Sequence, residues 1–246
     1  MSESAIDLVT IAKVWGYYFL PFLPGSPEIG TLSEADCVCA QSFGRRNFED
    51  SELPWIHRLR RSLGDDKKTL EWLESYGFDP GPANLELARI TINLACSLGS
   101  NGDILPIFTQ WEIAFALYSI DRDWFEYNLE NIVVLWPPLT LPYWTHNLLK
   151  DFRKSARKKG LRKPLLLASD LMLARVIPIA WRLGINLIIP SKRLGLGKKQ
   201  SLDRLSIQPH TQRLIWWNPW RCWIFRESFG RCYHIRRGLV SFRPPR

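Results

Sequence analysis

Several polar side chains that could bind a small molecule stand directly after short apolar runs of this 246-residue chain. Ser42 and Gly44 would let a ligand approach the backbone closely, and Arg45 could hold an anion. Glu112 and Asp170 could accept hydrogen bonds from hydroxyls or amines, or act as a general acid and base. The complete set of candidate binding residues is Ser42, Gly44, Arg45, Gln110, Trp111, Glu112, Thr145, His146, Asn147, Ser169, Asp170 and Arg175.

Most of these residues also have an ordinary structural interpretation. Asp170 could be no more than a helix N-cap, and Thr145 could cap the helix that it begins. Glu112 and Arg175 could form an ion pair that only stabilises the fold. A histidine such as His146 is more often a surface residue than a catalyst, although its pKa suits proton transfer. The residues therefore predict a binding site and leave any reaction open.

The familiar catalytic and cofactor motifs are missing from the sequence. It contains no G-x-x-x-x-G-K-[ST], no G-x-G-x-x-G, no G-x-S-x-G and no H-E-x-x-H. The four histidines are scattered, and the five cysteines include no C-x-x-C, so no metal site is expected. We expect reduced, structural cysteines and a cytoplasmic protein.

Five short apolar runs must position the candidate residues. The runs are continuous rather than alternating, which is typical of strands buried on both faces. Pro106 in the second run favours an edge position or irregular pairing for that strand. The runs cover residues 36–42, 104–108, 132–136, 165–168 and 186–189.

Helical patterns alternate with these strands, which indicates βαβ units and a parallel sheet. The predicted fold is α/β, a Rossmann-like three-layer sandwich with a mostly parallel five-stranded sheet. Ligands of such sheets bind outside the carboxyl ends of the strands, which is where the candidate residues stand. The predicted helices cover residues 64–77, 84–98, 111–120, 144–159 and 170–183.

The remaining segments complete the predicted organisation. Residues 1–34 form an N-terminal helical extension. Its apolar stretch, residues 6–23, contains charged residues, which predicts an amphipathic helix and not a membrane span. Residues 35–190 form the core, with an insertion at about 45–82. Residues 191–246 form a basic loop and a last helix that starts at Asn218-Pro219 and packs on the core.

Charge is divided unevenly along the chain, whose net charge is +9. Residues 1–150 hold 11 Lys/Arg and 20 Asp/Glu, whereas residues 151–246 hold 22 and 4. The basic part also interleaves arginines with tryptophans at Arg213, Trp216, Trp217, Trp220, Arg221, Trp223 and Arg226. Such a surface can bind nucleic acid or another anionic surface. The alternatives are a solvated basic face and tryptophans that pack the last helix on the core.

The order of these pieces resembles the DUF218, or YdcF-like, family of bacterial α/β proteins. The matching pieces are Ala35-Asp36 to Gly44, Gln110-Trp111-Glu112, Thr145-His146-Asn147, residues 165–175 and a late Arg226-Glu227 followed by Tyr233. One departure is Met172, which stands where the family usually has a histidine three residues before Arg175.

The resemblance implies a Rossmann-like fold and a small polar or anionic ligand of the nucleotide type, such as S-adenosylmethionine. It also implies that any chemistry needing the missing histidine has been lost. The predicted function is thus binding of such a ligand at the carboxyl ends of the strands. Nucleic-acid or anionic-surface binding through residues 151–246 is the alternative.

Overall fold

The computed structural model describes residues 6–20, 28–42, 53–100, 102–136, 145–168, 170–189 and 219–245. Its centre is a sheet of four parallel strands, β1 (Cys37–Ala40), β2 (Ile107–Gln110), β3 (Ile132–Leu135) and β4 (Pro164–Leu167). The strands lie in the order β3-β2-β1-β4. The chain thus adds strands on one side of β1 and then crosses back to place β4 on the other side. The predicted α/β class with a parallel sheet is confirmed.

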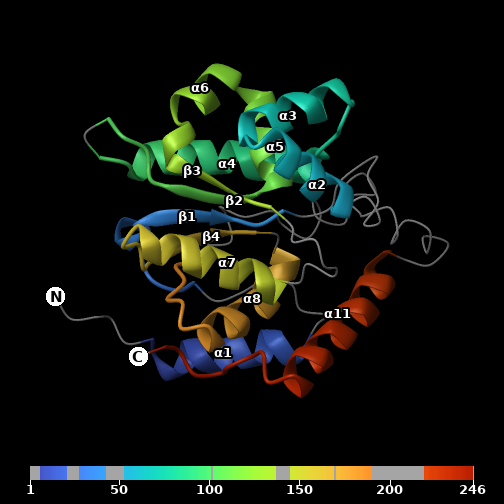
Figure 1. Ribbon diagram of the computed structural model, residues 1–246. Helices are drawn as coiled ribbons and strands as arrows, with labels where there is room; N and C mark the ends of the chain where they lie inside the picture. The colour runs from blue at the N-terminus through green and yellow to red at the C-terminus, as the bar shows by residue number, and fades with distance from the viewer. Residues whose placement is uncertain are drawn as a thin grey trace.

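Helices cover both faces of this sheet (Figure 1). One face carries α2 (Leu53–Leu63), α3 (Asp66–Ser75), α4 (Pro82–Leu98), α5 (Trp111–Ile120) and α6 (Arg122–Tyr127). The other face carries α7 (Thr145–Lys158) and α8 (Asp170–Arg182). Two short 3-10 turns, Leu32–Glu34 and Leu129–Asn131, lead into β1 and β3.

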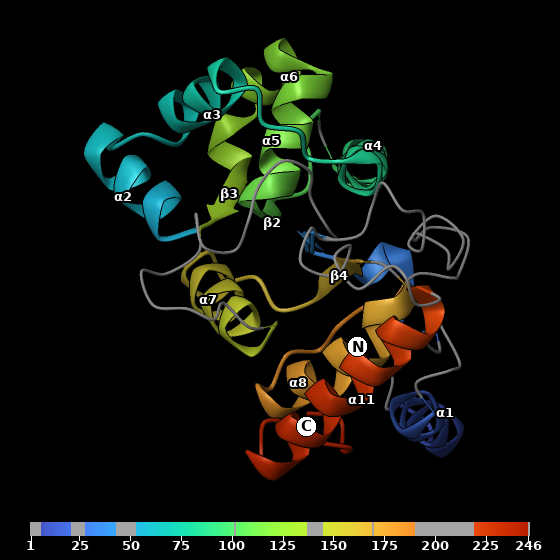
Figure 2. The same cartoon turned by 90° about the vertical axis from the view of Figure 1, so that its right-hand side faces the viewer.

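The two ends of the chain form a further layer beneath α8. Helix α1 (Leu8–Phe19) packs on α8, and α11 (Pro219–Arg236) lies across α8 beside it (Figure 2). Val14 of α1 belongs to the same apolar core as the inward faces of α7 and α8. The opposite face of the sheet has its own core, made with α2 to α6. Both faces of every strand are therefore buried, as the continuous apolar runs indicated.

The prediction of a fifth strand at residues 186–189 is wrong. Ile188 makes one parallel bridge to Leu165 of β4, while Ile189 makes an antiparallel bridge to Ile29. The amide of Ile188 donates to Pro164 over 2.8 Å, and the amide of Ile189 donates to Ile29 over 2.9 Å. Because two adjacent residues pair with two different segments, no ladder forms. The apolar run nevertheless lies at the edge of the sheet next to β4.

The edge position inferred from Pro106 is also wrong. Strand β2 lies inside the sheet, between β1 and β3. Pro106 immediately precedes it and uses its carbonyl to accept a hydrogen bond from Val38 of β1 over 2.9 Å. A proline just before a strand removes no ladder donor from that strand.

Helix boundaries follow ordinary capping chemistry. Asp65 accepts hydrogen bonds from the amides of Lys67 and Lys68 at the start of α3, and Pro82 is the first residue of α4. The five predicted core helices agree with α3, α4, α5, α7 and α8 to within a few residues, whereas α2 and α6 were not predicted.

Within the described ranges, no helix is both long enough and apolar enough to cross a membrane.

Candidate functional site

The direction of strand addition reverses between β1 and β4, and the carboxyl ends of these two strands mark the reversal. In parallel α/β sheets this is where ligands usually bind. Helix α5 begins directly after β2, and α8 begins three residues after β4. Their amino-terminal ends thus lie at the same edge of the sheet, where their dipoles favour negative charge.

Two glutamines lie side by side at this edge. The register pairs Ala40 of β1 with Thr109 of β2, so the next residues, Gln41 and Gln110, are neighbours. Side chains alternate along a strand, and Cys37 and Cys39 face the core under α7 and α8. Gln41 and Gln110 therefore lie on that same face, on neighbouring strands at the centre of the sheet.

Gln41 is fully buried, yet neither its Oε1 nor its Nε2 has a hydrogen-bond partner among the described residues. Its backbone amide is satisfied, because it donates to Leu167 of β4 over 2.9 Å. A buried side-chain amide without partners is costly, and most buried polar groups in proteins are paired. Gln41 was not among the residues selected from the sequence, because a glutamine after an apolar run has no motif of its own.

Ser42 and Gln110 were both selected, and the structure brings them together. The Ser42 amide donates to Oε1 of Gln110 over 2.8 Å, and the Ser42 hydroxyl lies 3.1 Å from the same atom. Gln110 Oε1 is thus held by two donors, which fixes the orientation of its amide. The contact joins the ends of β1 and β2.

Trp111 and Glu112 begin α5, and both are buried. The Trp111 ring packs against Phe78, with ring centroids 4.9 Å apart, and stacks with Trp136 at 6.3 Å. Trp111 is therefore part of the core on the α4–α5 side. Glu112 is a buried carboxyl group at the first turn of α5, beside the carboxyl end of β2.

Thr145, His146 and Asn147 form the first turn of α7. Thr145 and His146 are half-buried, while Asn147 is exposed. His146 lies close enough to His234 of α11 for its charge to affect that residue. Burial, helped by the positive charges of Arg175 and His146, lowers the pKa of His234 to about 4.

Arg175 is held by a buried ionic network rather than by Glu112. Its Nη1 lies 2.9 Å from Oε2 of Glu227, whose Oε1 lies 3.0 Å from Nε of Arg231. Arg231 Nη1 also donates to the backbone carbonyls of Tyr17 and Tyr18, over 2.7 and 2.6 Å. The network ties α8 and α11 to α1, so the sequence-based pairing of Arg175 with Glu112 is wrong.

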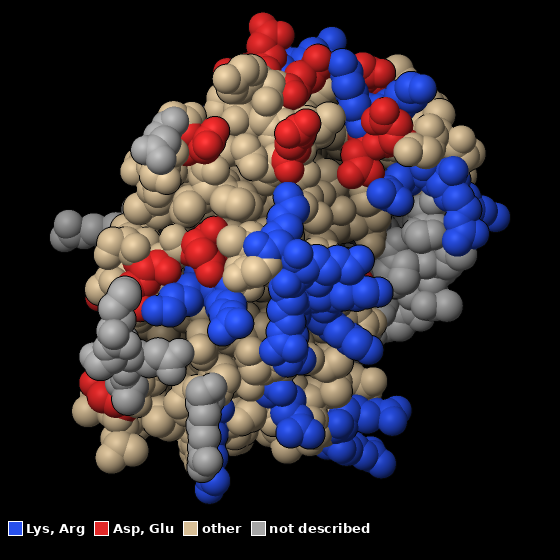
Figure 3. Space-filling view, turned by 60° about the vertical axis from the view of Figure 1, so that its left-hand side comes forward, with Lys and Arg blue, Asp and Glu red and all other residues tan. Residues whose placement is uncertain are grey.

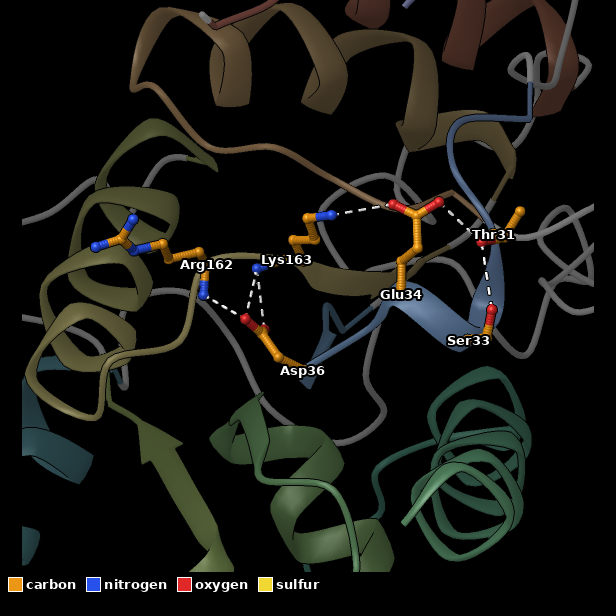
Figure 4. A network of polar contacts seen from close by, with 6 residues as sticks. All are labelled: Thr31, Ser33, Glu34, Asp36, Arg162 and Lys163. Carbon is orange, nitrogen blue, oxygen red and sulfur yellow. Dashed lines mark hydrogen bonds and ion pairs between the residues drawn. The ribbon is translucent and has the colours of Figure 1, made fainter. Parts of the chain in front are cut away.

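The Asp36 that supports the family resemblance lies at the opposite, amino-terminal edge of the sheet (Figure 4). Its carboxylate accepts hydrogen bonds from the backbone amides of Arg162, at 2.6 Å, and Lys163, at 2.9 Å. The Lys163 side chain reaches Glu34 at 3.1 Å, and Glu34 accepts from the Thr31 hydroxyl at 2.9 Å. These contacts fix the start of β4 beside the start of β1, so the role of Asp36 is structural.

Some of the selected residues cannot be placed. Gly44, Arg45 and Ser169 lie outside the described residues, and of Asp170 only the backbone, at the start of α8, is described. In the arginine–tryptophan segment, Arg213, Trp216 and Trp217 also lie outside the described residues. Of Trp220, Arg221, Trp223 and Arg226 only the backbone, in the first part of α11, is described. In the described part of the chain, no group of three His, Cys, Asp or Glu side chains could hold a metal ion. Met172 is half-buried and packs against the core under α7 and α8.

A scan against protein-family models, a search of curated proteins and a search of solved structures each found no match to this chain.

Proposed function

We propose that this protein binds a small polar or anionic ligand of the nucleotide type at the carboxyl ends of β1, β2 and β4. The observation that carries the proposal is Gln41, a buried amide with no hydrogen-bond partner among the described residues. It lies where the strand order reverses, and a ligand there would offer the partners that the described side chains do not.

Two further features support this choice of ligand. The amino-terminal ends of α5 and α8 favour an anionic group such as a phosphate or carboxylate. The oriented amide of Gln110 stands beside Gln41, and a pair of amides can both donate to and accept from a nucleobase or ribose.

The family assignment belongs to the same proposal. We propose a Rossmann-like arrangement and a distant relation to the DUF218 proteins, on the sequence pieces named above. The strand order β3-β2-β1-β4, with its reversal between β1 and β4, supports this arrangement. S-adenosylmethionine is accordingly the first compound to test.

A thermal-shift experiment on the full chain tests the proposal. S-adenosylmethionine, S-adenosylhomocysteine and adenine nucleotides are each added to the wild type and to two variants. A ligand at a hundred times its Kd should stabilise by about 2.7 kcal/mol, a rise in Tm of about 5–10 °C for a chain of this size. Gln41→Met should lose this rise in Tm. Asn84→Leu, which removes a buried amide side chain from α4, should keep it.

The proposal fails if no compound raises the Tm of the wild type, or if Gln41→Met responds as the wild type does. In the second case a ligand binds, but not at the end of β1.

A second candidate function is nucleic-acid binding, which the surface of α7 favours. Lys150, Lys154, Arg157 and Lys158 follow one another at helical spacing on its exposed face, opposite the buried Leu149. Figure 3 shows Lys and Arg side chains gathered in one group on this side of the molecule, below the acidic side chains of the α3–α6 layer. Such a row can neutralise successive phosphates.

Double-stranded DNA and RNA of random sequence test this candidate in a gel shift at low salt. Binding should weaken steeply with added salt and with Lys154→Glu/Arg157→Glu. Absence of a shifted band at low salt excludes the candidate and leaves the ligand proposal untouched.

A further inference from the structure

Helix α1 is apolar on two adjacent sides, about 100° apart around its axis. Its inward side, with Ile11, Val14 and Tyr18, packs against the core under α8. Its outward side presents Leu8, Ala12, Trp15 and Phe19, at spacings of four, three and four residues, which place them along one line. We call these four residues the outer stripe.

The outer stripe is open to solvent. Leu8 is 83% exposed, Trp15 47% and Phe19 53%, and Val9 beside the stripe is 60% exposed. A helix that only completes a soluble core normally carries polar residues on its outward side. The apolar outer stripe therefore needs another explanation.

The C-terminal segment extends the apolar surface. Phe242 packs between Trp15 and Phe19, with ring centroids 4.9 and 5.4 Å from theirs. The Trp15 indole donates to the carbonyl oxygen of Phe242 over 3.3 Å, and the amide of Ser241 donates to Pro178 of α8 over 2.9 Å. The aromatic cluster thus belongs to both ends of the chain and is anchored on α8.

Basic side chains flank the apolar surface of α1. Lys13 is exposed one turn after Val9, on the side of the helix away from Trp15, and Arg243 is exposed directly after Phe242. Arg182 at the end of α8 donates to the carbonyl oxygen of Gly238 over 3.1 Å, which places it beside the exposed Arg237. Within residues 6–20 the one acidic residue is Asp7, whose carboxylate accepts a hydrogen bond from the amide of Thr10.

We propose that the outer stripe of α1 docks on the surface of a membrane that contains anionic lipids. Leucine, tryptophan and phenylalanine on one face with basic residues beside them are the composition of helices that lie in a lipid interface. The shape of the molecule favours a lipid surface over a protein groove. Helix α1 lies along the outer boundary of the fold, at the end opposite α6, where a flat surface can reach it (Figures 1 and 2).

Vesicle sedimentation with the full chain tests the proposal. Vesicles of phosphatidylcholine with about 30% phosphatidylserine are compared with vesicles of phosphatidylcholine alone. The wild type should bind the anionic vesicles at least about tenfold more tightly than the neutral ones. Lys13→Glu/Arg243→Glu, which leaves the outer stripe intact, should abolish this preference.

Leu8→Glu/Val9→Glu removes apolar contacts and should weaken binding to the anionic vesicles by about tenfold or more. Both positions are in the first turn of α1, where acidic residues favour the helix dipole, so folding is retained. Tyr127→Glu is the matched control, because Tyr127 is 88% exposed on α6 at the other end of the molecule.

Three results would overturn the proposal. The first is a wild type that does not sediment with anionic vesicles, and the second is a Leu8→Glu/Val9→Glu variant that binds them as tightly as the wild type. The third is a wild type that dimerises through the outer stripe, so that the double variant is monomeric and neither protein binds vesicles. None of these results bears on the ligand site, which the thermal-shift experiment tests separately.

Discussion

Replacing Gln41 with methionine should stabilise the protein, although it removes a polar residue from the candidate site. Methionine has the same unbranched length as glutamine and adapts readily to a buried site. The change removes two buried polar atoms that have no hydrogen-bond partner among the described residues, and it leaves the backbone hydrogen bond to Leu167 intact. A residue kept for binding is expected to cost the unliganded protein stability in this way.

The magnitude follows from the cost of burying an unpaired amide, about 1–3 kcal/mol in mutational data. Methionine also gains transfer free energy at a site that is fully buried. We therefore expect the free energy of unfolding to rise by about 1–2 kcal/mol. For a chain of this size that corresponds to an increase in Tm of about 2–8 °C.

Asn84→Leu provides the matched control. Asn84 is also a fully buried amide, but its Nδ2 donates to the carbonyl oxygen of Pro80 over 2.8 Å. Removing a satisfied hydrogen bond should lower stability by about 1–2 kcal/mol. The same kind of substitution should therefore change stability in opposite directions at the two sites.

Urea unfolding followed by circular dichroism measures both variants against the wild type. Equal slopes with urea concentration show that the midpoints can be compared directly. If Gln41→Met is less stable than the wild type by 1 kcal/mol or more, on the order of the cost of one lost hydrogen bond, the Gln41 amide has protein partners. The main support for the ligand site is then gone.

Three further predictions concern the rest of the fold. Arg231→Met should cost about 3–5 kcal/mol, because it breaks a buried ion pair and two backbone contacts to α1; urea unfolding should show no comparable loss for the exposed Arg237→Met. Burial lowers the pKa of His234 from its usual 6.5 to about 4, so the folded protein resists protonation of this residue. The free energy of unfolding should therefore keep its full value above pH 7 and fall by about 3 kcal/mol as the pH decreases to 4. Thermal unfolding across this range should show a flatter profile for His234→Phe. Asp36→Ala should cost about 1–3 kcal/mol without reducing ligand-induced stabilisation, and a lost ligand response would contradict its purely structural role.

Local pattern in the sequence was enough for most of the helices and the strands. Runs such as 132–136 and 165–168 are continuously apolar, which is typical of a strand covered by helices on both faces. The run at 186–189 has the same composition, yet it forms only bridges. Its pairing is divided between Pro164 and Ile29, which are far apart in the sequence, and composition carries no information about such partners.

The sequence by itself determined the parallel α/β class and the edge of the sheet to which Ser42, Gln110 and Glu112 belong. The physical reason is that burial and helix capping are local, and parallel strands bring their carboxyl ends to one edge. Only the tertiary structure decided which side chains meet there. It paired Arg175 with Glu227 from the far end of the chain and left the amide of Gln41 without a described partner. Hydrogen bonding between distant residues depends on how the layers pack, and spacing along the chain does not encode it.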